Sequence, residues 1–248
     1  MKQFVLTPAM GKRLIGKALP RHPDVRMVLD RGTVVVVAGT TNGYVAEETL
    51  AFCGDDSGFR RQGFRRGMTL PPGTARPEGT FTGDVVIVDG QRMADVEIFD
   101  VVDDVKAGDV IVKGANAVHL PSRRAAVYIG HPMGGTIAAA IPAVIGRRVK
   151  VIVPVGLEKR VTRPVEELAE LCNRPDTEGP RMMPIPGEVF TELDAIYHLT
   201  GCRATLLAGG GVCGAEGAVW IGIEGDASET EAATQLVQSL AGEPPCCP

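Results

Sequence analysis

The stretch DVIVKGANAVHLPSRRAAVYIGHPMGGT, residues 109–136, decides how the chain folds. It contains two short apolar runs, 110–112 and 125–129, and each run ends in polar or glycine-rich residues. The connection between them contains Pro121 and Ser122 and is barely long enough for a crossover helix, so we expect a hairpin-like excursion. A strand that ends in glycines and polar side chains is the usual place for an α/β sheet to hold a ligand.

Apolar, β-branched runs of this kind recur along the chain and are typical of strands buried on both faces. They begin at Val34, Val85, Val110 and Val149. The sequence predicts helices at residues 10–19, 25–29, 44–53, 137–145 and 162–172, with a kink at Pro142. We therefore expect an α/β fold with a mainly parallel sheet flanked by helices. The ends of the four strands should open into one shared crevice.

The pattern changes near residue 181. From there the chain is expected to form a strand at 181–185, a helix at 188–199, strands at 204–208 and 218–224, and a helix at 228–240 with Glu231 at N3 of a capping box. This order is most of a split β-α-β unit. We therefore predict an α/β ligand-binding domain at 1–180 and a smaller ferredoxin-like α+β domain at 181–248.

The composition excludes several classes of protein. Hydrophobic residues make up 44% of the chain and charged residues 23%, which is typical of a soluble globular protein. The net charge of −4 gives no reason to expect nucleic acid binding, and the longest apolar stretch, 137–145, is too short to cross a bilayer. The six cysteines form no C-x-x-C pair, which favours reduced thiols in the cytoplasm and no metal site. We expect no cofactor.

Residues 54–83 form a long excursion without periodicity, apart from one short strand expected around 68–70, and loops of this size are often functional lids or mobile segments. This segment carries Arg60, Arg61, Arg65 and Arg66. The arginines are either solvated loop charges or a clamp on an anionic ligand.

The first buried strand leads into a second candidate anion site. Gly39, Thr40, Thr41, Asn42 and Gly43 precede the helix predicted at 44–53. Free N–H groups and the helix dipole at such a turn attract anions. The alternative is ordinary capping by threonine or asparagine, since Glu47 and Glu48 already oppose the dipole.

Two further strand ends carry groups for acid–base chemistry. Asp89 follows the run 84–88, and Glu158 and Lys159 follow the strand at 149–155. The Glu158–Lys159 pair is either a general acid/base with an electrophilic partner or a surface ion pair.

The loop 209–214 matches G-x-G-x-x-G but precedes a predicted strand, whereas a dinucleotide site needs a helix there. The remaining interpretation is a glycine-rich hairpin loop in which Cys213 is a candidate nucleophile.

The string GANAVHLPSRRAAVYIG (114–130), followed by GGT, an alanine-rich helix and a strand, resembles the Gly-Ala-Asp-x-Val, hairpin, Ile-Gly-Thr pattern of methylthioribose-1-phosphate isomerases and the regulatory subunits of initiation factor 2B. These belong to the superfamily of ribose-5-phosphate isomerase, glucosamine-6-phosphate deaminase and CoA-transferase folds. The turn 39–43 is similar to the phosphate-binding turn of the ribose isomerases. The family's aspartate falls on Asn116, whose amide cannot accept a proton as a carboxylate does, which argues against proton-transfer isomerisation.

Together these features predict an enzyme of isomerase or transferase type that acts on a small phosphorylated or carboxylated metabolite. The alternative is a sensor or assembly subunit that binds the metabolite without turning it over. The expected partners are a small anionic metabolite and further copies of the chain, with no nucleic acid and no membrane. Catalytic candidates are Asp89, Lys113, His119 and Glu158. Ligand-binding candidates are Gly39, Thr40, Thr41, Asn42, Gly43, Gly114, Asn116, His131, Gly134, Gly135, Thr136 and Lys159.

Overall fold

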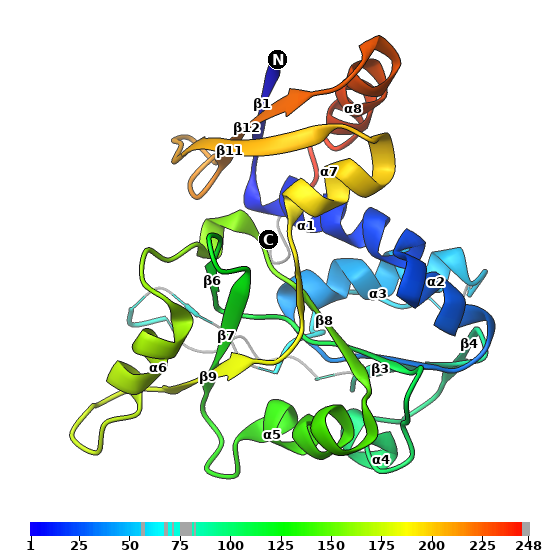
Figure 1. Ribbon diagram of the computed structural model, residues 1–248, viewed down its shortest axis with the longest axis vertical. Helices are drawn as coiled ribbons and strands as arrows, with labels where there is room; N and C mark the ends of the chain where they lie inside the picture. Colours follow the sequence, from blue (N-terminus) through cyan, green and yellow to red (C-terminus); the bar gives the residue numbers. More distant parts are fainter. Residues whose placement is uncertain (56–57, 67–68, 71, 75–80, 82, 245–248) are drawn as a thin grey trace.

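The computed structural model shows an α/β protein with three sheets (Figure 1). It describes residues 1–55, 58–66, 69–70, 72–74, 81 and 83–244. The strand expected around 68–70 falls partly outside this range, and Cys246 and Cys247 lie outside it. The other four cysteines are free thiols. Within the described ranges, no helix combines the length and the apolarity that a membrane span requires.

The central sheet has six strands in the order β10-β8-β5-β2-β3-β4. Four of them, β10, β8, β5 and β2, run parallel, whereas β3 and β4 are antiparallel to their neighbours. Their bounds are β2 Thr33–Val36, β3 Val85–Val88, β4 Gln91–Met93, β5 Val110–Val112, β8 Lys150–Pro154 and β10 Glu188–Phe190. The apolar runs predicted to form a buried sheet are therefore neighbours in it, and the parallel-rich α/β prediction is confirmed.

Helices cover both faces of this sheet. On one face α1 (Pro8–Ala18), α2 (Pro23–Asp30) and α3 (Thr40–Phe52) pack on alternate strand residues such as Val34 and Val36. On the other face α4 (Ile98–Val101) and α5 (Gly135–Ile141) pack on the intervening residues such as Val35 and Ile111. Each strand therefore buries both sets of side chains, as its unbroken valine and isoleucine run predicts.

The prediction that four strand ends share one edge is wrong for β3. Because β3 runs antiparallel to β2, its amino end lies beside the carboxyl end of β2, and its carboxyl end lies at the opposite edge of the sheet. Asp89 follows that carboxyl end. Its Oδ1 accepts a hydrogen bond from the Gly32 N–H at 2.8 Å, and its own N–H donates to the Gly32 carbonyl at 2.9 Å. Asp89 is thus separated from the other candidates by the length of the strands.

The hairpin predicted between residues 112 and 125 is confirmed. β6 (Ala117–His119) pairs antiparallel with β7 (Arg124–Ile129). β9 (Arg181–Ile185) joins the other side of β7 and completes a three-stranded sheet, against which α6 (Val165–Cys172) packs.

The third sheet joins the two ends of the chain. β1 (Lys2–Leu6) pairs with β12 (Val219–Glu224), which pairs with β11 (Arg203–Gly209), all antiparallel. Residues 181–185 and 188–190 belong to the other two sheets, so the ferredoxin-like arrangement predicted from residue 181 is not confirmed. α7 (Glu192–Thr200) and α8 (Ala227–Ser239) pack on the third sheet, which lies on the far side of α1 from the central sheet (Figure 1). The buried residues of β12 belong to the same core as those of α1 and α3.

Some helix boundaries differ from their predictions. α3 begins at Thr40 rather than near residue 44, so the polar turn forms its first turn. Pro142 begins a π-helical turn, Pro142–Gly146, that leaves Ile145 69% exposed. The capping box of α8 uses Asp226 and Glu229 rather than Glu231. The glycine-rich loop 209–214 joins two antiparallel strands, β11 and β12, which agrees with the rejection of a dinucleotide site.

Candidate functional site

A cavity of about 1350 Å³ lies at the carboxyl ends of β2 and β5, bordered by the start of α5 and by the end of β7. The structure brings together twelve of the predicted site residues in its lining. They are Gly39, Thr40, Thr41, Asn42, Lys113, Gly114, Asn116, His131, Gly134, Gly135, Thr136 and Lys159. Four predicted residues do not line it: Gly43, Asp89, His119 and Glu158.

The first turn of α3 is open to a ligand. Gly39 is the N-cap residue in extended backbone, no side chain among the described residues caps the helix, and no acidic residue lies in its first turn. The N–H groups of the first turn have no partner within the helix, and the dipole concentrates positive charge there. Glu47 and Glu48 do not oppose it, because they lie two turns along the helix and pair with Arg13.

Two buried side chains at this helix start each have a polar atom without a hydrogen-bond partner among the described residues. They are the hydroxyl of Thr41, which is 2% exposed, and Oδ1 of Asn42, which is 0% exposed. The amide nitrogen of Asn42 donates to the carbonyls of Val37 at 2.6 Å and Val112 at 3.0 Å. Asn42 thereby ties the ends of β2 and β5 together and leaves its oxygen as a free acceptor beside Gly114. Unsatisfied buried polar atoms are costly and rare, so they indicate a position where a ligand supplies the missing bonds.

Lys113 follows β5 and lines the cavity. Its ammonium group donates only to the carbonyl of the next residue, Gly114, at 3.3 Å, and it makes no salt bridge within the described part of the chain. Burial lowers the pKa of Lys113 to about 8, Asp84 opposes this effect, and Lys159 and Arg66 add to it. A lysine of this kind is a cation that readily gives up its proton.

Lys159 reaches the same cavity from the 3-10 turn Leu157–Lys159, which follows β8. Its Nζ donates to the carbonyl of Ala115 at 2.8 Å. Burial lowers its pKa, and Glu158 partly offsets this. A hydrogen bond fixes the first residue of this turn, because the Leu157 N–H donates to the buried carboxyl of Glu192 at 2.9 Å.

Asp84 and Arg66 were not predicted as a pair, although Arg66 lines the cavity. Asp84 precedes β3 and accepts from the backbone N–H groups of Ala38 at 2.8 Å and Ile98 at 3.0 Å. Arg66 donates to Asp84 at 2.7 Å and to Glu97 at 2.8 Å. The sequence did not predict Asp84 as a site residue, because Asp84 lies at this edge of the sheet only when β3 runs antiparallel to β2.

Two arginines of the cluster, Arg61 and Arg66, are neither solvated loop charges nor free to clamp a ligand. Arg66 is held as described above. Arg61 is 9% exposed, pairs with Glu47 and Glu243, and lies over the ring of Tyr44 at 4.4 Å. Both guanidinium groups hold the fold together.

Three further candidates make contacts that serve the fold. His119 Nδ1 lies 2.7 Å from the Ser122 hydroxyl in the hairpin. Oδ1 of Asn116 accepts from the Tyr128 N–H at 3.0 Å. Gly43 lies inside α3, where a Cβ would approach Arg61 Cβ to 2.9 Å. These contacts explain the residue types without a ligand.

Glu158 is also engaged. It forms an ion pair with Lys12 at 2.9 Å, and although burial favours its neutral form, Lys12 and Lys159 lower its pKa. The sequence left two alternatives for Glu158 and Lys159, a general acid/base with an electrophilic partner or a surface ion pair. The structure supports neither, because Glu158 pairs with Lys12 and Lys159 lines the cavity.

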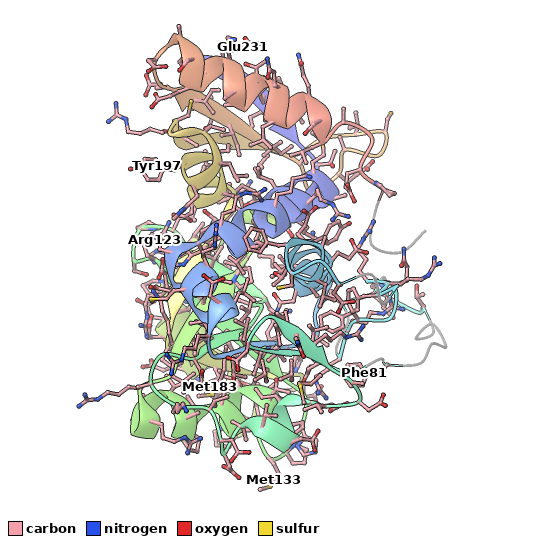
Figure 2. All side chains as sticks on the ribbon, turned by 90° about the vertical axis from the view of Figure 1, so that its right-hand side faces the viewer. Phe81, Arg123, Met133, Met183, Tyr197 and Glu231 are labelled. Atoms are coloured by element: carbon pink, nitrogen blue, oxygen red, sulfur yellow. The ribbon has the colours of Figure 1, made fainter. Side chains whose placement is uncertain are left out.

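The mouth of the cavity is apolar. Phe99 is 52% exposed, Tyr128 46% and Met133 78%. Met133 lies at the opposite end of the molecule from Glu231 on α8 (Figure 2). The His131 Nδ1 accepts from the Met133 N–H at 3.1 Å, which shapes this turn before α5.

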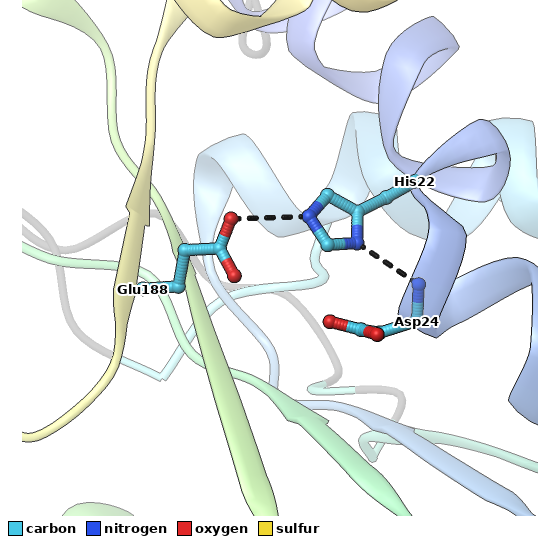
Figure 3. Close-up of side chains that lie close together, drawn as sticks. All are labelled: His22, Asp24 and Glu188. Carbon is cyan, nitrogen blue, oxygen red and sulfur yellow. Dashed lines mark hydrogen bonds and ion pairs between the residues drawn. The ribbon is translucent and has the colours of Figure 1, made fainter.

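A second cluster of polar groups lies at the opposite edge of the central sheet, where His22, Asp24 and Glu188 come within metal-ligand distance of one another (Figure 3). The His22 Nδ1 accepts from the Asp24 N–H at 3.3 Å, so the neutral ring carries its proton on Nε2, which lies 3.1 Å from Glu188. Lys150 bridges Asp24 and Glu188. The donor set therefore does not suit a metal: the imidazole lone pair is used and an ammonium group already neutralises the carboxylates.

No protein-family model matches the chain, and no match was found among curated proteins or solved structures. The function must therefore be inferred from the geometry of the cavity.

Proposed function

We propose that the cavity binds a small phosphorylated or carboxylated metabolite and that the protein is an enzyme of isomerase or transferase type acting on it. The observation that supports this most is the uncapped start of α3, where the Thr41 hydroxyl and the Asn42 oxygen have no partner in the described structure. An anionic group at this helix start accepts from the backbone N–H groups and from the Thr41 hydroxyl.

The charge around this position suits an anion. Lys113 and Lys159 line the cavity, and none of its described lining residues is an aspartate or glutamate. An anion between the two ammonium groups relieves their mutual repulsion and makes charge-assisted hydrogen bonds. The Asn42 oxygen accepts from a hydroxyl or amino group of the same ligand, so we expect a hydroxylated or aminated metabolite.

The same lining favours an alternative. With no described carboxylate in the cavity and Asn116 in place of the aspartate of the resembled isomerases, the usual base for proton transfer is missing. A protein that binds its metabolite as a sensor or assembly subunit needs no such base. We also propose, from the resemblance of residues 114–136, membership of the ribose isomerase and CoA-transferase superfamily. The cysteine pattern supports a cytoplasmic location, and we propose a homo-oligomeric state as well.

Calorimetric titration with inorganic phosphate tests the binding site. The wild type should bind phosphate, and Thr41→Val should bind about tenfold more weakly because one donor is lost. Lys106→Met, at an exposed position, is the control and should bind as the wild type does. Equal affinities of the wild type and Thr41→Val would place the anion elsewhere.

A thermal-shift screen of sugar phosphates, nucleotides and acyl-CoAs then identifies the metabolite. An enzyme should convert the compound that stabilises it most, whereas a sensor should bind that compound and return it unchanged.

A further inference from the structure

We propose that Lys113 is a nucleophile that condenses with the carbonyl group of an anionic aldehyde or ketone to form an imine. The inference rests on the proposed function and deepens it, because it defines the substrate as a carbonyl compound with a phosphate or carboxylate group.

The position of Lys113 suits this role. Its side chain lines the cavity at the carboxyl end of β5, beside the uncapped helix start that would hold the anionic group. Its single hydrogen bond, to the adjacent Gly114 carbonyl at 3.3 Å, is long and leaves the nitrogen free to turn to a ligand.

The charged groups around Lys113 leave its ammonium form poorly stabilised. Among the described residues, Asp84 is the acidic group that faces it, and Asp84 is already engaged by Arg66 and two backbone N–H groups. Lys159 and Arg66 are the cations that face it. A lysine that is desolvated and placed beside other cations is the arrangement that activates an amine for attack on a carbonyl.

The size of the effect is large enough to matter. Burial lowers the pKa of Lys113 to about 8. At about pH 7 roughly 10% of such an amine is neutral, compared with about 0.04% for an ordinary exposed lysine, a difference of roughly 200-fold.

Lys159 is the less suitable nucleophile. Its Nζ is held by a 2.8 Å hydrogen bond to the Ala115 carbonyl, and the charge of Glu158 stabilises its ammonium form. Lys159 is better placed to bind the anionic group of the substrate or to hydrogen-bond the carbonyl oxygen as the amine attacks.

The reaction balances without a further reactant. The neutral amine of Lys113 attacks the carbonyl carbon, and the π electron pair of the C=O bond moves to oxygen. The oxygen takes up the two protons that the amine loses and leaves as water, and a C=N bond remains. The imine acidifies the neighbouring C–H bond, which allows carbonyl chemistry to proceed in a cavity whose described lining has no carboxylate.

Borohydride trapping tests the proposal. The wild-type protein is incubated with glycolaldehyde phosphate at neutral pH, sodium borohydride reduces any imine to a stable secondary amine, and peptide mass spectrometry locates the adduct. We expect Lys113 to be modified at least tenfold more than the exposed Lys106, and inorganic phosphate to compete.

Two variants make the test specific. Lys113→Arg keeps a cation but removes the amine, so it should still bind phosphate and should lose the adduct. Lys106→Arg, the matched control, should keep it. Modification spread evenly over exposed lysines, or placed on Lys159, would overturn the imine proposal. If both proteins bind phosphate but the wild type forms no adduct at Lys113, the imine proposal is wrong and the proposed binding site still holds. Failure of the wild type to bind phosphate would overturn both.

Discussion

Replacing Glu192 by glutamine should remove a pH-dependent loss of stability. Glu192 is the first residue of α7, is 2% exposed, and accepts the Leu157 N–H that fixes the turn carrying Lys159. Burial, and then the charge of Glu158, raise its pKa to about 8. The carboxyl group is therefore protonated in the folded protein at neutral pH, whereas it is ionised in the unfolded chain.

The direction of the effect follows from this difference. Between the ordinary pKa of 4.5 and the folded value of about 8, the folded state binds one more proton than the unfolded state. The free energy of unfolding therefore falls by about 1.4 kcal/mol per pH unit over that interval. Between about pH 5.5 and about pH 7.5 the contribution of Glu192 amounts to roughly 3 kcal/mol.

The assay is urea unfolding of the wild type and Glu192→Gln at several pH values. Glutamine has nearly the same volume and keeps an oxygen for the Leu157 N–H, but it does not titrate. The variant should gain stability relative to the wild type as the pH rises, by roughly 3 kcal/mol over two pH units. Glu170→Gln, on the exposed face of α6, should run parallel to the wild type. A difference between Glu192→Gln and wild type that does not change with pH would refute the buried neutral carboxyl.

Three further substitutions test other parts of the account. Asp84→Asn breaks the buried ion pair with Arg66 and should lower the free energy of unfolding by roughly 3 kcal/mol; an unchanged urea midpoint would contradict this. Lys113→Met removes a cation whose pKa is lowered from 10.5 to about 8, so at neutral pH the substitution should stabilise the protein by up to about 3 kcal/mol. This gain should disappear by about pH 10.5, and the variant should bind phosphate more weakly; a lower melting temperature at neutral pH would contradict the assigned environment. Asp89 lies at the edge of the sheet opposite the cavity and is hydrogen-bonded to Gly32, so Asp89→Asn should leave the phosphate affinity unchanged in calorimetry. A loss of affinity would contradict the placement of Asp89 away from the binding site.

The sequence was sufficient to predict four strands of the central sheet, β2, β3, β5 and β8, and twelve of the residues that line the cavity. Unbroken valine and isoleucine runs predict strands buried on both faces, and the parallel strands β2 and β5 end where Thr41 and Lys113 were expected to meet a ligand. The hairpin β6–β7 followed from the short connection. These predictions depend on local patterns, which a single sequence contains.

Strand direction and distant pairing could not be predicted in the same way. A short run such as 85–88 has the same composition whether it runs parallel or antiparallel, so Asp89 was predicted to lie in the site and Asp84 was left out of it. The pairing of β1 with β12 joins the two ends of the chain, and nothing in either strand specifies its partner. The burial of Glu192 was equally hidden, because a glutamate in the first turn of a helix is normally exposed there.

The central claim is that an anion binds at the start of α3, between Lys113 and Lys159. The most direct measurement is the anomalous scattering of crystals soaked in tungstate, a heavy tetrahedral anion. The account predicts a tungsten peak about 4 Å from the backbone nitrogens of Thr41 and Asn42, with a tungstate oxygen at hydrogen-bond distance from them. Tungstate bound only at other sites, with this helix start empty, would contradict it.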